Sequence, residues 1–127
     1  VVRAVNTATG IITTVAGSGN RGFGGDESQA TSASFQYPTG LWANTVGELF
    51  IVDMWNYRIR KVATDGIITT YAGTGDDGNN GDSMQATNIQ LSLPHAVVGD
   101  TLGNIFVTDS NNNRVLSIAP FGWTLRI

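Results

Sequence analysis

The segment GIITTVAG at residues 10–17 returns as GIITTYAG at residues 66–73, an offset of 56 residues. The correspondence continues without a gap, so that Pro38 falls on Pro94. A fixed long period is typical of repeat architectures, in which one unit cannot bury its own apolar face and packs against a neighbour. The repeat therefore decides the fold more firmly than it decides the function.

Each unit carries four strand signals separated by turns. Runs of β-branched and aromatic residues bounded by Gly, Asp and Asn predict strands, and in the first complete unit they cover residues 38–43, 49–52, 58–62 and 67–72. The second copy gives 94–98, 105–108, 114–118 and 123–127. Residues 1–5 and 11–16 match the third and fourth strands of a unit, with a one-residue insertion before Gly10. The sequence thus predicts ten strands.

Short antiparallel meanders at a regular period predict an all-β fold made of four-stranded β-propeller blades, without substantial helix. The links at residues 17–37 and 73–93 are long, but their repeated pattern indicates ordered loops rather than disorder. We divide the chain into a partial blade at 1–16 and two blades, each with a long leading loop, at 17–72 and 73–127.

Several motifs together resemble NHL repeats, of the long-period kind with an extended loop before the first strand. They are the GIITT-x-AG strand, the Gly-Asp loop, the proline-initiated strand and the run LFIVD-x-x-N-x-RIRKV at residues 49–62. The resemblance implies a β-propeller, commonly six-bladed. It also implies a wide range of roles, from scaffolds and recognition modules to lyases and lactonases, so that it leaves the function open.

Composition restricts the partners. The net charge is −3 and charged residues make up 13% of the chain, which disfavours nucleic acid because phosphate binding needs a basic face. No apolar run approaches the ~20 residues that span a bilayer, so membrane insertion is not expected. Cysteine is absent, which excludes disulfides and thiolate metal sites. We expect a protein partner, either further blades of one polypeptide or copies of this chain that form a ring or a filament.

One polar pattern recurs at the same place in both units. Its members are Asp53, Asn56 and Arg58 in the first copy and Asp109, Asn112 and Arg114 in the second. Such a pattern could form a polar ring on one propeller face. Repetition in every unit favours a structural role instead, with Asp capping backbone amides and Arg bracing the neighbouring blade.

Two features could bind a metal. Asp76, Asn80 and Asp82 lie in a loop rich in oxygen donors, which suits calcium, although the parallel loop lacks most donors and a glycine-rich turn is the simpler interpretation. His95 is the single histidine and begins an innermost strand, where a channel metal or a base could lie, but Thr39 occupies the equivalent position. We predict no cofactor, with calcium as the alternative, and no catalytic residue set.

Trp55 and Tyr57 lie in a turn, and their counterparts are Asn111 and Asn113. Exposed aromatic residues often mark contact surfaces, so a protein or sugar contact there competes with a local packing role. Phe50 and Phe106, with Ile51 and Val107 on the opposite strand faces, are predicted to be buried between adjacent blades.

Two functions compete. The favoured one is a non-enzymatic structural or recognition scaffold, outside the cell or on its surface, able to assemble with itself. The alternative is a fragment of a propeller enzyme, a lyase or a lactonase-like hydrolase, in which His95 lies near a channel metal.

Overall fold

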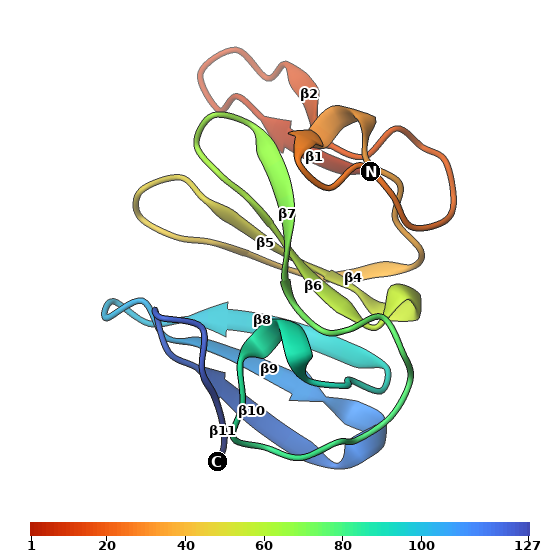
Figure 1. Ribbon diagram of the computed structural model, residues 1–127. Helices are drawn as coiled ribbons and strands as arrows, with labels where there is room; N and C mark the ends of the chain where they lie inside the picture. Colours follow the sequence, from red (N-terminus) through yellow and green to blue (C-terminus); the bar gives the residue numbers. More distant parts are fainter.

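The computed structural model describes all 127 residues as two stacked β-sheets and an N-terminal hairpin (Figure 1). The middle sheet has the order β3-β7-β6-β5-β4, and the C-terminal sheet has the order β11-β10-β9-β8. The hairpin consists of β1 (Val2–Val5) and β2 (Ile12–Ala16). The predicted all-β fold of propeller blades is confirmed, and below we call residues 17–72 the middle unit and residues 73–127 the C-terminal unit.

The strands of the middle sheet follow the sequence pattern closely. They are β4 (Pro38–Ala43), β5 (Leu49–Asp53), β6 (Arg58–Val62) and β7 (Ile67–Ala72), each antiparallel to the next. The sequence analysis missed β3 (Ser28–Gln29), a two-residue strand of the long loop that pairs with β7 at the outer edge. Two residues are too short to leave a periodic signal, and their pairing depends on a strand far along the chain.

The C-terminal sheet repeats this plan with β8 (Pro94–Gly99), β9 (Ile105–Asp109), β10 (Arg114–Ile118) and β11 (Thr124–Arg126). Its long loop also reaches the outer strand, through one isolated bridge between Gln85 and Trp123. Both sheets show the same irregular register at the proline that begins the inner strand. The two units are therefore copies in backbone geometry as well as in sequence.

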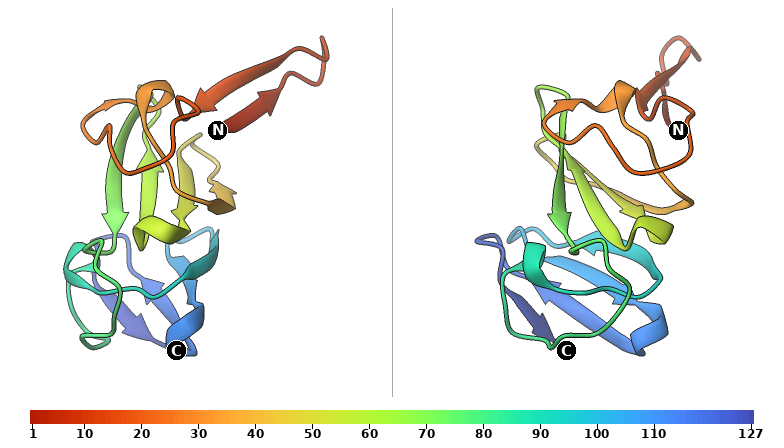
Figure 2. Two further views of the ribbon diagram at one scale, coloured as in Figure 1. Left: turned by 90° about the vertical axis from the view of Figure 1, so that its right-hand side faces the viewer. Right: turned by 45° about the vertical axis from the view of Figure 1, so that its right-hand side comes forward.

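The N-terminal hairpin projects away from the rest of the chain (Figure 2). Its register pairs Val2 with Ala16, as Ile59 pairs with Ala72 in the middle sheet. Val1 therefore takes the place that Arg58 takes in the next unit, and the extra residue predicted before Gly10 is absorbed in the hairpin turn.

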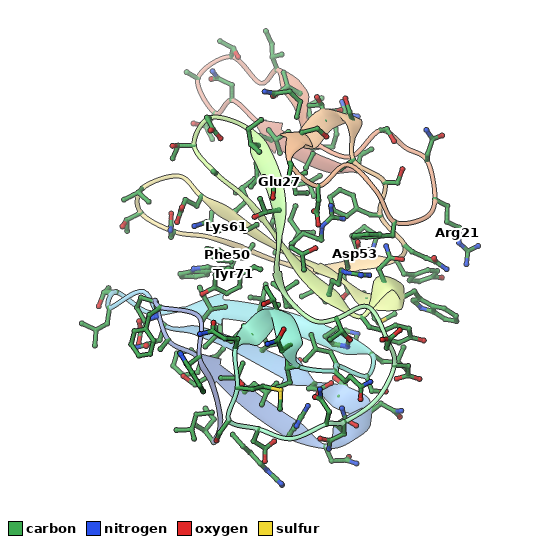
Figure 3. All side chains as sticks on the ribbon, viewed as in Figure 1. Arg21, Glu27, Phe50, Asp53, Lys61 and Tyr71 are labelled. Carbon is green, nitrogen blue, oxygen red and sulfur yellow. The ribbon has the colours of Figure 1, made fainter.

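Side chains of β5 alternate between two apolar clusters. Phe50 and Val52 belong to the cluster between the two sheets, whereas Ile51 belongs to the cluster under the long loop of the middle unit. Figure 3 shows Phe50 and Tyr71 at the boundary with the C-terminal sheet, where their rings meet edge to face at 5.0 Å. This alternation lets one strand join both neighbours.

The burial prediction holds for Phe50, Ile51 and Val107, but it is wrong for Phe106, which is only half-buried. Ile105 and Val107 face the middle sheet. Phe106 lies between them on β9 and so points to the opposite face, which no further sheet covers in this chain.

The inner strands β4 and β8 lie side by side. Contact is close at Gly40, where an added Cβ would lie 2.9 Å from the His95 carbonyl oxygen and 2.8 Å from the Val52 side chain. Glycine is required there because any larger residue would push the strands apart.

Helical structure is limited to four three-residue 3₁₀ turns. Two lie in the long loops, η1 (Ala30–Ser32) and η3 (Ala86–Asn88), and two follow the second strand of a sheet, η2 (Met54–Asn56) and η4 (Ser110–Asn112). None of these helical turns has the length or the apolar character needed to cross a membrane.

Candidate functional site: the polar turns and the exposed aromatic residues

The turn after the second strand holds the long loop in place in both units. The Asp53 carboxylate accepts a hydrogen bond from the Gln36 amide at 2.7 Å and one from the Asn56 side chain at 2.8 Å. The Asn56 amide group also donates to the Gly22 carbonyl at 2.8 Å. The two ends of the loop are thereby tied to one turn.

The C-terminal unit reproduces this arrangement. Asp109 accepts from the Ser92 amide at 2.6 Å and from Asn112 at 2.8 Å, and Asn112 donates to the Gly78 carbonyl at 2.8 Å. Asp53 and Asp109 are fully buried. Buried carboxylates are stable only when hydrogen-bonded or paired with a cation, so the turn also needs an arginine.

The arginine differs between the units. Arg114 in β10 bonds Asp109 at 2.7 Å and Asp82 at 2.6 Å, and it donates to two loop carbonyls, those of Gly81 and Gln90. Sequence alignment equates Arg114 with Arg58. Arg58, however, forms no salt bridge with Asp53 or Asp26, the equivalents of Asp109 and Asp82.

Arg60 performs the equivalent task in the middle unit. It bonds Asp26 at 2.6 Å, reaches Asp53 at 3.3 Å and donates to the Gly24 carbonyl. Its side chain is fully buried. Sequence reasoning missed Arg60 because its aligned partner is Leu116. The alternation of side chains along a strand offered a signal, since positions 58 and 60 share one face.

Arg58 joins the two units instead. Its guanidinium donates to the Thr74 carbonyl at 2.8 Å and lies 3.9 Å from the centre of the Phe23 ring. Burial lowers the pKa of Arg58, and the nearby Arg60 charge lowers it further. Burial also raises the pKa of Asp53, against the opposing effects of Asn56, the Gln36 amide and Arg60.

Two of the three candidate calcium ligands in the oxygen-rich loop bond within the protein. Asp82 pairs with Arg114, and the Asn80 side chain accepts from the Gln90 amide and donates to the Asn88 carbonyl, each at 2.8 Å. Asp76 is exposed. No group of three or more His, Asp or Glu side chains is arranged to hold a metal ion.

His95 is exposed on β8, and its backbone carbonyl accepts a hydrogen bond from the Thr39 hydroxyl at 2.9 Å. The bond joins the two equivalent positions of neighbouring inner strands. The imidazole belongs to no salt bridge and to no cluster of acidic side chains that could hold a metal ion, so the structure groups it with no other candidate residue.

The two aromatic residues of the turn behave differently. Tyr57 is half-buried in a left-handed backbone conformation, whereas Trp55 is 46% exposed. The Trp55 ring lies 6.0 Å from that of Tyr37, which is 63% exposed. Sequence reasoning missed Tyr37, because nothing in the sequence brings the end of the long loop to this turn.

Comparison with known proteins identifies the repeat. Residues 91–116, which include Asp109, Asn112 and Arg114, match the model of the NHL repeat. The resemblance stated from the sequence is thereby confirmed, and the signature of the repeat coincides with the buried aspartate and its arginine.

Known relatives share only part of their length with the chain. The chain is 28% identical over 94 residues to the protein SUPPRESSOR OF QUENCHING 1, chloroplastic, of Arabidopsis thaliana. The aligned region covers 73% of the chain and 9% of the plant protein. Among solved structures, an auxiliary nutrient binding protein of Bacteroides thetaiotaomicron matches with a TM-score of 0.65 and 21% identity, over 91% of the chain and 31% of its own. A streptogramin B lyase matches with a TM-score of 0.54 and 13% identity, over 70% of the chain and 25% of its own. At these identities the structures show the fold alone.

Proposed function

We propose that the chain is part of a non-enzymatic NHL-repeat scaffold that recognises another molecule. The observation that carries the proposal is the use of the repeated polar residues: Asp53, Asn56, Asp109, Asn112 and Arg114 all bond within the chain. Groups that hold loops to blades are not free to act on a substrate. The exposed aromatic residues of the middle unit remain as the part of the surface suited to contact, since Trp and Tyr are enriched in binding hot spots.

The scaffold would be completed by further blades, from the same polypeptide or from copies of the chain. Several large apolar side chains of the C-terminal unit favour such a neighbour, because they stay exposed on or beside its sheet: Val98, Phe121, Trp123 and Leu125. Association of copies would give a ring or a filament. Sedimentation over a concentration series tests this part: mass that rises with concentration supports assembly of copies, and a constant monomer mass contradicts it.

A place outside the cell or on its surface belongs to the same proposal. The similarity to a nutrient binding protein supports a location at the cell surface. The plant relative, in contrast, is named as a chloroplastic protein. Fractionation of cells that make the protein from its own gene decides between these compartments.

The second candidate function is a fragment of a propeller enzyme, favoured by the lyase of the same fold and by the position of His95 on an inner strand. Metal analysis of the purified protein and of His95→Ala separates the two. We expect no divalent metal that depends on His95. A metal present at about one per chain and lost in His95→Ala would overturn the scaffold.

A further inference from the structure

A groove separates two equivalent turns at the end of the blades opposite η2. The turns join β4 to β5 at residues 44–48 and β8 to β9 at residues 100–104. Figure 1 shows both turns on the same side of the molecule, away from the 3₁₀ turns that follow β5 and β9. The groove has a volume of about 410 Å³, and a cavity of about 180 Å³ shares part of its lining. We call the two turns and the groove the turn face.

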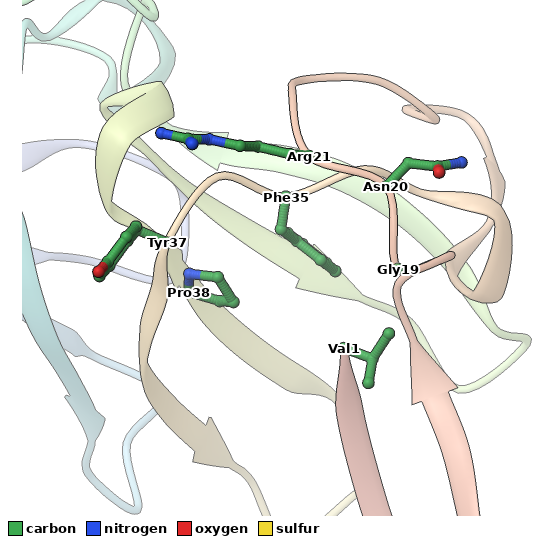
Figure 4. A pocket seen from close by; sticks show the side chains of 7 residues that line it. All are labelled: Val1, Gly19, Asn20, Arg21, Phe35, Tyr37 and Pro38. Atoms are coloured by element: carbon green, nitrogen blue, oxygen red, sulfur yellow. The ribbon is translucent and has the colours of Figure 1, made fainter.

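Both walls of the groove belong to complete blades. The lining residues lie within 42–46 and 99–103, in two units whose inner strands are side by side. Figure 4 shows a different hollow at the other end of β4, beside Tyr37 and Pro38, which Val1 also lines. Val1 belongs to a partial blade, so the extent of that hollow depends on further residues. The groove depends only on blades that the chain holds in full.

The tip of each turn carries an exposed aliphatic side chain. Val46 is 67% exposed and Leu102 is 78% exposed. Polar residues close the turn instead: Asp100 accepts from the amides of Leu102 and Asn104, each at 2.9 Å, and Gly103 adopts a φ of 85°. The fold therefore does not need an apolar tip, and exposed apolar residues gathered around one groove mark an interaction surface.

Neighbouring blades leave both tips uncovered. Val46 belongs to a unit that another unit follows, and Leu102 belongs to a unit that another unit precedes. Since each tip stays exposed, a blade on either side of a turn does not bury it. Further blades would pack beside the sheets, so the turn face stays open in a longer array of blades.

Trp42 lines both the groove and the adjoining cavity. Its counterpart is Val98, so the fold accommodates an aliphatic residue at this position. The indole N–H is buried without a hydrogen-bond partner against Gly99, where an added Cβ would lie 2.5 Å from the nitrogen. An unpaired buried donor reduces stability. Packing alone does not account for tryptophan here, which favours a role in contact, where this residue type is enriched.

The turn face is acidic. Glu48 and Asp100 line the cavity, and the single cation of its lining, Lys61, pairs with Glu48 at 2.6 Å. Asp100 belongs to none of the five ion pairs. Hydrogen bonds from the Asn104 side chain and from the turn amides lower the pKa of Asp100, so its carboxylate stays charged near neutral pH. Exposed Asp65, in the turn from β6 to β7, adds a second carboxylate outside any ion pair at the same end. A positively charged partner is favoured.

Other occupants fit this face less well. A second copy would bring the same acidic turns, and like charges across an interface repel. An anionic lipid surface is repelled in the same way. A small molecule inside the groove would leave the tips at Val46 and Leu102 exposed, whereas a chain that crosses the groove contacts both.

We propose that the turn face binds a basic, apolar peptide segment of another protein. An aliphatic side chain of the peptide packs between Val46 and Leu102 and against Trp42, and a neighbouring arginine pairs with the Asp100 carboxylate through charge-assisted hydrogen bonds. The inference rests on the recognition function proposed above and goes beyond it, because this surface lies at the other end of β5 from the exposed aromatic residues beside η2.

Calorimetric titration of the 127-residue chain with a short acetylated and amidated peptide tests the proposal. The probe is Leu-Arg-Gly-Leu-Arg-Gly. One control replaces arginine with glutamate, and a second control replaces leucine with serine. We expect saturable binding of the probe below about 1 mM and at least about tenfold weaker binding of both controls. The indole NMR signal of Trp42 should shift on binding, and those of Trp55 and Trp123 should not.

Variants of the turn face have matched controls elsewhere on the molecule. Leu102→Ser should weaken binding of the probe at least about tenfold, whereas Leu125→Ser, at a side chain that is 58% exposed on β11, should leave it unchanged. Asp100→Asn introduces the residue of the equivalent position, Asn44, so the turn stays closed. It should weaken binding about threefold, the scale of an exposed ion pair, while Asp77→Asn in the long loop should not. Thermal unfolding verifies that each variant is folded.

Equal affinity for the probe and either control peptide overturns the proposal, and so does an affinity that neither Leu102→Ser nor Asp100→Asn reduces. A shift of the Trp55 signal in place of the Trp42 signal overturns it as well. Failure of the probe to bind below about 1 mM does the same. The scaffold function itself fails by a separate measurement, a metal that depends on His95, so the two failures are distinguishable.

Discussion

The middle and C-terminal units hold the same buried aspartate with different arginines. In the C-terminal unit Arg114 begins β10 and bonds Asp109 at 2.7 Å. In the middle unit the arginine that pairs with the buried aspartate is Arg60, two residues further along the strand, and its distance to Asp53 is 3.3 Å. The move releases Arg58 to bond the loop of the next unit at Thr74. A repeat signature therefore specifies a task in three dimensions, and a neighbouring residue on the same strand face can perform it.

The largest expected effect separates the two arginines of β6. Arg60→Leu leaves the buried Asp53 without a cation, and loss of one partner of a buried pair costs about 3–5 kcal/mol. Arg58→Leu, which removes a half-buried contact between units, should cost only about 1–2 kcal/mol. Urea unfolding of both variants measures the difference. Equal losses would contradict the assignment of Arg60 as the arginine that compensates the buried Asp53.

The second comparison uses the two equivalent phenylalanines. Phe50 is buried between the sheets, so Phe50→Ala should cost about 3–5 kcal/mol. Phe106 is half-buried on the outer face, and Phe106→Ala should cost roughly half as much. Denaturation midpoints of the two variants in the 127-residue chain decide, and a larger loss for Phe106 would show that its face is covered in solution.

A pH dependence of stability tests the burial of Asp53. Burial raises the pKa of Asp53, so the folded state holds its proton more tightly than the unfolded state. Its contribution to stability is therefore present below the unfolded pKa of about 3.9 and is lost as the pH rises through the folded pKa. The free energy of unfolding of the wild type should fall relative to that of Asp53→Asn over this window. A difference independent of pH would contradict the shift.

The smallest effect is expected in the exposed loop of the C-terminal unit. Asp77→Ala should change stability by no more than about 0.5 kcal/mol, the usual scale for surface positions. The same midpoint measurement checks it. A loss greater than that of Phe50→Ala would make the loop a structural site, with bound calcium as the first explanation to test.

The sequence predicted the strands well because their signals are local. The repeat, the alternation around Phe50 and the turn at Asp53 are all contained in short stretches, and they placed β6, β7 and β10 at their observed bounds. The short strand β3 was missed because its partner lies about forty residues away, and loop-closing contacts leave no periodic pattern.

The candidate site was harder to predict for the same reason. Alignment gave the correct type of residue at Arg58 but not its contacts, because two arginines of one strand face compete for one acid. Tyr37 joins Trp55 through the backbone bond from Trp55 to Gln36, which only the folded loop creates. Burial of Phe106 was misjudged because it depends on a neighbour beyond the C-terminal sheet.

The pairing of β3 with β7 has a consequence for the order in which a unit forms. The antiparallel pairs from β4 to β7 join strands that are neighbours in sequence, and such hairpins close within microseconds. The amides of Glu27 and Ala30, in contrast, bond the Ile68 and Gly66 carbonyls, so they wait for the last hairpin of the unit. Pulse-labelled hydrogen exchange should find these two amides protected after those of β5 and β6, and simultaneous protection would contradict this order. On the ribosome, the long loop of each unit would leave the tunnel first and become fixed last.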